Sequence, residues 1–209
     1  MKLIIFDFDG VLRSGSWDIF YDAYKVLITA MGKNPESFFT DVVSFKKWTN
    51  VDWHKNEMRI LGGDTYVPNS EFNRIFHDAC DPHLKLFPWV PDLLAHLSKK
   101  YTLAILSSST KASVEKELGE LTQYFSFIIG AEDVRSLKPN PEGVRLILKL
   151  TNTDTSEALI IGDMNVDYLA GKSAGIKTAL VVWGMGDREE LQELKPDFLF
   201  EDSTELFNL

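Results

Sequence analysis

The sequence contains a single cysteine, Cys80, among its 209 residues. One thiol excludes an internal disulfide and a cysteine-rich zinc site, and it is typical of a protein kept in a reducing compartment. No run approaches the roughly 18–20 uncharged apolar residues of a membrane span. Asp7 and Asp9 interrupt the apolar N-terminal run before it reaches the length of a secretory signal. We therefore expect a cytoplasmic protein that does not associate with membranes.

Basic residues are also scarce, because 22 Lys and Arg stand against 31 Asp and Glu and give a net charge of −9. A protein that binds the nucleic-acid backbone needs a basic face, so this charge excludes nucleic acid as a general partner. Much of the acidity lies in the C-terminal stretch 187–205 and in four aspartates at the ends of apolar runs. A small phosphorylated metabolite remains an acceptable partner, because a few fixed groups suffice to hold one phosphate.

Short apolar runs alternate with segments of helical periodicity along most of the chain. The runs cover residues 3–6, 103–106, 127–129, 158–161 and 178–182, with 198–200 as a sixth. Runs without polar alternation are typical of strands buried on both faces of a parallel sheet. Strands that alternate with helices indicate a doubly wound, Rossmann-like α/β fold.

The block 14–83 breaks this alternation, since it has no buried-strand run but several segments of helical period. We therefore predict two domains: an α/β core made of residues 1–13 and 84–209, and a small helical domain, 14–83, inserted after the first strand. The block is rich in aromatic residues. We interpret them as the core that a small helical unit needs, in preference to a platform that stacks a ligand.

Asp7 and Asp9 directly follow the first apolar run, in the motif Asp-Phe-Asp-Gly. In open α/β sheets, ligands bind outside the carboxyl ends of the strands, and acids two residues apart in extended chain point to the same side. Their repulsion is expected to raise one pKa, so that one carboxylate is a nucleophile and the other a proton donor. The alternative is a pair of solvated acids at a strand end.

Two further polar features follow other predicted strands. Ser107, with Ser108 beside it, ends the run 103–106, where a hydroxyl and backbone N–H groups form a cradle for an oxyanion. Plain capping of the next helix is the alternative. Lys138 precedes a proline that keeps it out of helical geometry. Its ammonium suits a phosphoryl oxygen, although most lysines simply lie on the surface.

The last feature is Gly162-Asp163, which ends the run 158–161, with Asp167 four residues further on at the start of a helix. Mg²⁺ prefers oxygen ligands and keeps several waters, so one or two protein carboxylates plus substrate oxygens suffice to bind it. The alternative is that these acids only complement a helix N-terminus.

In this order, and each at the end of its own strand, the four motifs resemble those of the haloacid dehalogenase-like hydrolase superfamily. The likeness spans nearly the whole chain, and the insertion 14–83 is similar to that family's helical cap. The segments 183–186 and 189–197 most resemble phosphoglycolate phosphatase-like members. Arg13, Ser108 and Met164 differ from the residues common at these positions in that branch. None of the three differences removes a catalytic group. They therefore leave open which substrate is bound.

This resemblance implies an Mg²⁺-dependent phosphatase that works through an aspartyl-phosphate. It makes Asp7 the nucleophile and Asp9 the acid and base. Mg²⁺ would be bound by the carboxylates of Asp7 and Asp163 and by the backbone carbonyl of Asp9, while Asp167 orients these groups. The residues expected to hold the phosphoryl oxygens are Ser107, Ser108 and Lys138. The cap is expected to close over the site, and the candidate specificity contacts are Arg13, Lys46, Lys47, His54 and Arg59.

Three alternatives stay open at this point. A phosphomutase of the same fold would use the same nucleophile and the same acid. A phospho-acceptor signalling receiver also combines Asp, Ser or Thr and Lys in an α/β sheet, but it is much shorter. A dehalogenase would need neither Asp9 nor a metal. The physiological substrate, and the choice between monomer and dimer, are not readable from the sequence.

Overall fold

The computed structural model describes residues 1–49, 53–63 and 70–209. The chain divides into two compact units. The first joins Met1–Gly15 to Leu86–Leu209, and the second is Ser16–Lys85. The domain borders expected from the sequence, after residues 13 and 83, fall two residues before those of these units.

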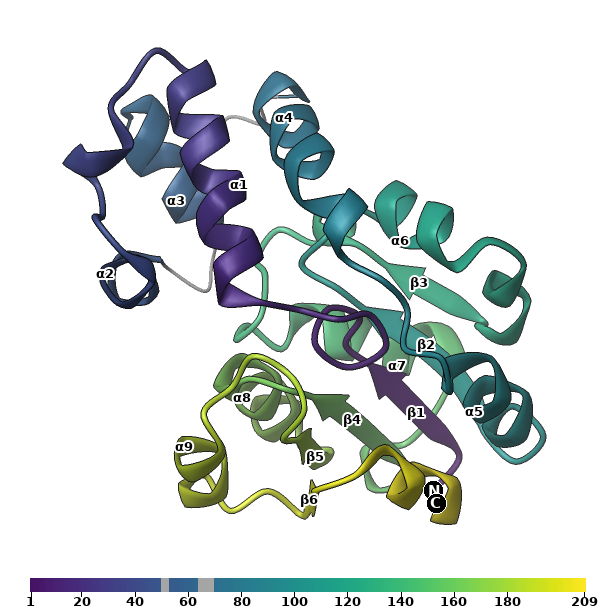
Figure 1. Ribbon diagram of the computed structural model, residues 1–209. Helices are drawn as coiled ribbons and strands as arrows, with labels where there is room; N and C mark the ends of the chain where they lie inside the picture. The colour runs from purple at the N-terminus through teal and green to yellow at the C-terminus, as the bar shows by residue number, and fades with distance from the viewer. Residues whose placement is uncertain (50–52, 64–69) are drawn as a thin grey trace. The chain divides into compact units, whose positions relative to one another are not determined.

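The first unit is built on a six-stranded sheet in the order β3-β2-β1-β4-β5-β6 (Figure 1). All neighbouring strands are parallel. The strands are β1 (Leu3–Phe6), β2 (Thr102–Leu106), β3 (Phe127–Ile129), β4 (Ala158–Gly162), β5 (Lys177–Val181) and β6 (Phe198–Phe200). The predicted doubly wound α/β fold is confirmed, including the short sixth strand.

Helices cover both faces of this sheet, which explains why the central strand is apolar throughout. In β1, Ile4 and Phe6 pack into one core cluster with α5 (Val90–Leu97) and α6 (Lys111–Leu118). The side chains of Leu3 and Ile5 alternate to the other face, where they pack with α7 (Glu142–Thr151) and α8 (Asn165–Ala174). All four β1 side chains are fully buried. The remaining elements of this unit are the helix α9 (Arg188–Glu193) and the 3₁₀ turns Gly119–Tyr124, Ala131–Asp133, Thr155–Glu157 and Ser203–Asn208.

The second unit is helical in its described residues. Its helices are α1 (Trp17–Ala30), α2 (Val42–Trp48), α3 (Trp53–Leu61) and α4 (Ser70–Cys80), with 3₁₀ turns at Pro35–Ser37 and Asp81–His83. The apolar residues Phe38, Phe39, Val42, Val43 and Phe45 have a helical spacing that favours a helix starting near Phe38. Instead, α2 starts after Asp41, because Asp41 and Ser44 form a reciprocal capping box. The side chain of His54, named above as a candidate contact, lies outside the described residues.

Aromatic side chains form the core of the second unit. Phe45 is fully buried, and its ring centroid lies 4.9 Å from that of Phe39 and 5.3 Å from that of Tyr24. Trp48 packs against the same three rings. The contacts include edge-to-face, tilted and stacked pairs, and aromatic pairs prefer edge-to-face and offset-stacked arrangements. The rings are thus engaged with one another, as expected of a small helical core. Within the described part of the chain, no helix is long and apolar enough to cross a membrane.

Replacing Phe45 with alanine is expected to lower the free energy of unfolding by about 3–5 kcal/mol, because it removes a fully buried ring and leaves a cavity. Val43→Ala in the same helix is the matched control, since Val43 is 63% exposed and its loss should change little. Chemical denaturation followed by circular dichroism measures both. Equal losses in the two variants would contradict this description of the core.

Candidate active site

The sheet topology brings three of the predicted site residues to one edge of the sheet. Asp7, Ser107 and Asp163 directly follow β1, β2 and β4, which are neighbours in the order β2-β1-β4. All three residues are buried. Lys138 comes from the segment between β3 and α7, and Asp167 lies in the first turn of α8. Residues up to 160 positions apart in sequence therefore meet at the carboxyl ends of three strands, as the sequence predicted.

Lys138 is the centre of the ionic contacts at this edge. Its Nζ lies 2.8 Å from Oδ1 of Asp7 and 2.6 Å from Oδ1 of Asp167. The lysine is 4% exposed and Asp167 is completely buried. Burial opposes the charge on Lys138, but the carboxylates of Asp167 and Asp7 more than compensate, so the pKa of the ammonium lies above its ordinary value. The interpretation of Lys138 as an ordinary surface lysine is therefore wrong.

At the carboxyl end of the sheet, three buried carboxylates lie close to the single ammonium of Lys138. Ligand atoms of Asp7, Asp163 and Asp167 all lie within 4.8 Å of one another. Burial, followed by the charge of Asp167, raises the pKa of Asp163 to about 7. Burial also raises the pKa of Asp7 well above its usual value, although Lys138 opposes the shift. A buried cluster of oxygen donors with excess negative charge fits a hard divalent cation such as Mg²⁺.

Backbone groups hold Asp163 in this crowded position. Its Oδ2 accepts a 2.7 Å hydrogen bond from the backbone N–H of Met185. Two glycines leave room for the carboxylate: a Cβ on Gly10 would lie 2.0 Å from Asp163 Oδ2, and one on Gly184 would lie 2.3 Å from it. Gly10 also has φ +82°, a conformation that side chains with a Cβ rarely adopt. Glycine is therefore required at position 10 for two reasons: its positive φ angle and the close approach of the Asp163 carboxylate.

Asp167 makes two sets of contacts, and one of them is the helix capping that the sequence offered as the alternative to a metal site. Its Oδ2 accepts a 3.1 Å hydrogen bond from the backbone N–H of Met164, which caps the start of α8. Its Oδ1 binds Lys138. The residue therefore caps a helix and fixes the lysine at the same time. Its carboxylate also lies within the acidic cluster, whose ligand atoms are within 4.8 Å of one another.

Asp9 lies outside the three-carboxylate cluster and is held by different partners. Its Oδ1 accepts bonds from Nε and Nη2 of Arg13, both at 2.6 Å, and its Oδ2 accepts a 2.8 Å bond from Oγ of Ser109. Arg13 is 2% exposed, and its guanidinium lies 5.0 Å from the centre of the Phe8 ring. A metal contact through the backbone carbonyl of Asp9 remains a prediction.

Sequence reasoning missed this role of Arg13 and Ser109. Arg13 was expected to contact substrate, whereas it is buried against Asp9, and no contact between Ser109 and Asp9 was predicted. The available signal was the spacing of Asp9 and Arg13, an acid and a base four residues apart across the turn at Gly10. Such a spacing is common, and without knowledge of burial it does not identify a fixed pair.

Ser107 is placed as expected at the end of β2, where it is 3% exposed. Its Oγ accepts a 3.0 Å hydrogen bond from the backbone N–H of Ser109, while Thr110 supplies the N-cap of α6. Ser107 is therefore not the capping residue of that helix. Ser108 is partly buried beside it. Binding of phosphoryl oxygens by these two residues stays a prediction.

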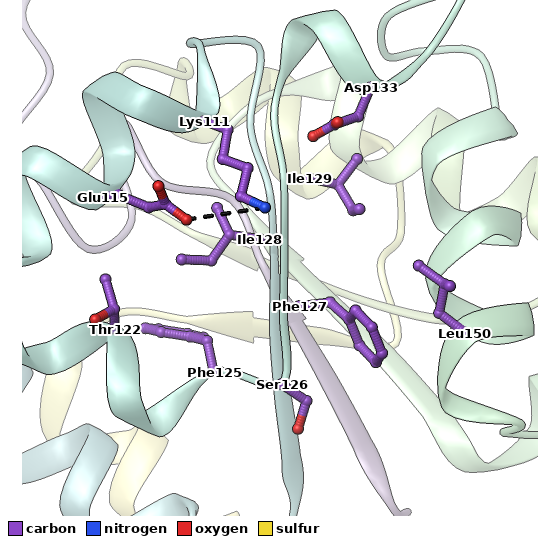
Figure 2. A pocket seen from close by; sticks show the side chains of 10 residues that line it. All are labelled: Lys111, Glu115, Thr122, Phe125, Ser126, Phe127, Ile128, Ile129, Asp133 and Leu150. Carbon is purple, nitrogen blue, oxygen red and sulfur yellow. Dashed lines mark ion pairs between the residues drawn. The ribbon is translucent and has the colours of Figure 1, made fainter.

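A pocket lies along β3, the edge strand of the sheet (Figure 2). Phe127 and Ile129 of β3 line it, together with Leu150 of α7 and the ion pair of Lys111 and Glu115, whose charged atoms are 3.8 Å apart. None of the predicted site residues lines this pocket. Its lining consists mainly of apolar residues and this partly solvated ion pair, with Asp133 as a second acid. The predicted site residues converge instead at the carboxyl ends of β1, β2 and β4.

Comparison with known families agrees with this geometry. The family model of the haloacid dehalogenase-like hydrolases matches residues 4–181, which is most of the chain. The chain therefore belongs to this family and is a hydrolase, and the resemblance drawn from the four motifs is confirmed.

Individual relatives cover nearly the full length of the chain. The pyrophosphatase PpaX of Bacillus cereus is 29% identical over 215 residues, which cover 99% of this chain and 94% of that protein. A Lactobacillus plantarum structure assigned as a phosphoglycolate phosphatase is 23% identical, with a TM-score of 0.76 and coverage of 99% and 98%. A Thermotoga maritima structure assigned as a β-phosphoglucomutase is 25% identical, with a TM-score of 0.70 and coverage of 100% and 97%.

The raised pKa of Asp163 predicts a pH dependence of stability in the metal-free protein. The carboxyl has a pKa of 3.8 when unperturbed and about 7 when folded. Between these values the folded state holds a proton that the unfolded chain has released. The free energy of unfolding should therefore fall as the pH rises through this window, and level off above the folded pKa.

Denaturant titrations in EDTA across this pH window measure the slope, with Asp163→Asn as the comparison. Asparagine keeps an acceptor for the N–H of Met185 but does not titrate. The variant should therefore show a flatter dependence on pH than the wild type. Parallel curves would show that Asp163 does not titrate in this range.

Proposed function

We propose that this hydrolase is an Mg²⁺-dependent phosphatase that hydrolyses a small phosphorylated metabolite through an aspartyl-phosphate intermediate. The observation that carries the proposal is the Asp7 carboxylate at the end of β1, bound by Lys138 beside the carboxylates of Asp163 and Asp167. The names of the relatives support the reaction class, since one is a pyrophosphatase and another is assigned as a phosphoglycolate phosphatase.

Asp7, Asp163 and the backbone carbonyl of Asp9 are the groups that would hold Mg²⁺, with the carboxylate of Asp167 close by. A bound Mg²⁺ would offset the charge of the phosphoryl oxygens, which is the largest obstacle to attack by a carboxylate. Lys138 would add a second positive charge at the same place. Because one ammonium serves two carboxylates, it is fixed before substrate arrives, and such preorganisation is what stabilises developing charge.

Asp7 would be the nucleophile. Its Oδ1 accepts hydrogen bonds from Lys138, at 2.8 Å, and from the backbone N–H of Phe8, at 2.7 Å. These bonds orient the carboxylate and favour Oδ2 as the attacking atom. In the first step a bond forms between this oxygen and phosphorus while the bond from phosphorus to the leaving oxygen breaks. In the second step water attacks the phosphorus, and Asp7 is regenerated as inorganic phosphate departs.

Asp9 would transfer the protons of both steps. It would give a proton to the leaving oxygen and then take one from the attacking water. Arg13 and Ser109 hold one oxygen of Asp9 each, so the orientation of the carboxylate is defined by contacts within the core unit. The helical unit is proposed to select the leaving group, as expected of a cap.

A phosphomutase is the second candidate, because one structural relative is assigned as a β-phosphoglucomutase. Both reactions use the same aspartyl-phosphate. They differ in what accepts the phosphoryl group, which is water in a phosphatase and a second hydroxyl of the sugar phosphate in a mutase.

Asp7→Asn is expected to lower kcat for a phosphate monoester by more than about a thousandfold, the order seen when a covalent nucleophile is removed. Asp154→Asn, an exposed acid before β4, is the matched control and should keep wild-type activity. Release of inorganic phosphate from a panel of phosphate esters, with Mg²⁺ or with EDTA, measures the effect. The wild type should lose its activity in EDTA and regain it when Mg²⁺ is added back.

Two results would count against this assignment. Equal phosphate release by wild type and Asp7→Asn would show that Asp7 is not the nucleophile. Activity unchanged by EDTA would show that the reaction does not need a divalent metal. Isomerisation of a sugar phosphate without release of phosphate would identify the mutase instead.

A further inference from the structure

The second unit carries a cluster of metal-ligand side chains that the proposed phosphatase reaction does not use. His77, Cys80 and Asp81 lie at the C-terminal end of α4 and the start of the turn that follows. Positions three and four residues apart share one face of a helix. One ligand atom from each residue, an imidazole nitrogen, the thiol sulfur and a carboxylate oxygen, lies within 4.8 Å of the other two.

Two of the three spacings between these atoms are close to those of ligands around one small cation. Bonds of about 2.0–2.2 Å to nitrogen or oxygen and 2.3 Å to sulfur, in a tetrahedron, place N and O about 3.3 Å apart and S and O about 3.5 Å apart. The corresponding distances are 3.4 Å from His77 Nδ1 to Asp81 Oδ1 and 3.7 Å from Cys80 Sγ to the same oxygen. The N–O distance is long for a hydrogen bond. Both distances are close to those between two ligand atoms that share one ion.

The types of donor atom define the class of metal. A thiolate and an imidazole bind zinc-type ions in preference to Mg²⁺, which requires oxygen ligands. A divalent ion bound by one thiolate, one carboxylate and one neutral imidazole also gives a site without net charge. Such neutrality limits the cost of placing the ion beside buried groups. This cluster is therefore chemically distinct from the three carboxylates at the end of β1 and β4.

The surroundings are consistent with a site that an ion can enter. Cys80 is 1% exposed and packs with Ala23 and Leu84 in a small apolar cluster. The side chains of His77 and Asp81 are 20% and 19% exposed, so one side of the cluster reaches solvent. Three protein ligands leave one tetrahedral position for water.

We propose that His77, Cys80 and Asp81 bind one zinc-type divalent cation, which ties the end of α4 to the turn Asp81–His83. The site is independent of the proposed phosphatase activity, because it shares no residue with it. Its role is stabilisation of the second unit, since an ion that binds only the folded arrangement raises the free energy of unfolding.

Co²⁺ provides a direct test, because a cobalt–thiolate bond gives an ultraviolet charge-transfer band that oxygen ligands do not give. Cys80 is the single cysteine of the chain, so any such band reports on this site. Tag-free, metal-stripped protein is titrated with CoCl₂ in excess MgCl₂, which competes at the oxygen-ligand site. The expected result is a band that saturates at one Co²⁺ per chain and is abolished by ZnCl₂.

His77→Ala is the informative variant, because His77 is partly exposed and its loss leaves the apolar cluster around Cys80 in place. It should weaken Co²⁺ binding by more than about tenfold, since even removal of an outer partner of a ligand costs that much. His83→Ala, which removes an exposed imidazole in the next turn, is the control and should bind like the wild type. ZnCl₂ should raise the Tm of wild type and His83→Ala but not that of His77→Ala.

Absence of the charge-transfer band in the wild type would overturn the proposal. So would a band of equal affinity in His77→Ala, because the thiol would then bind cobalt without the cluster. Cys80→Ser provides a second check: its band must disappear, and a Tm that still rises with ZnCl₂ as in the wild type would also contradict the site.

Discussion

The candidate active site depends on the ion pairs of the Lys138 ammonium, which is buried between Asp7 and Asp167. Removing carboxylates from water is costly unless each is paired or hydrogen-bonded. Here one lysine serves two of three buried acids, and the third, Asp163, has the N–H of Met185 and space provided by two glycines. The remaining negative charge favours a divalent cation, and that cation would in turn offset the charge of a phosphoryl group. Incomplete neutralisation is therefore part of the chemistry that we propose.

The parallel sheet makes this concentration of charge possible. Residues that follow β1, β2 and β4 meet because those strands are adjacent and point the same way. Their apolar side chains alternate between two helix-covered faces, so the strands are held rigidly from both sides. The second unit has a separate aromatic core. The proposed chemistry and the proposed choice of substrate thus fall to two units that are each stabilised by their own packing.

The strands and the site residues at their ends were predictable, because an uninterrupted apolar run has few interpretations and parallel strands place their ends together. The start of α2 was not predictable in the same way, because the capping box of Asp41 and Ser44 starts the helix after the apolar residues at 38 and 39. The pairing of Arg13 with Asp9 depends on burial, which no spacing reveals. The cluster of His77, Cys80 and Asp81 was also missed, because a single cysteine excludes only cysteine-rich metal sites.

The central claim is that the carboxylate of Asp7 accepts the phosphoryl group. The most direct measurement is to mix the Mg²⁺-loaded protein with p-nitrophenyl phosphate, quench it in acid within one turnover, and locate the added phosphate by peptide mass spectrometry. Phosphate is expected on Asp7, and it should disappear as free phosphate accumulates. Turnover with phosphate on another residue, or with no phosphorylated peptide at any quench time, would contradict it.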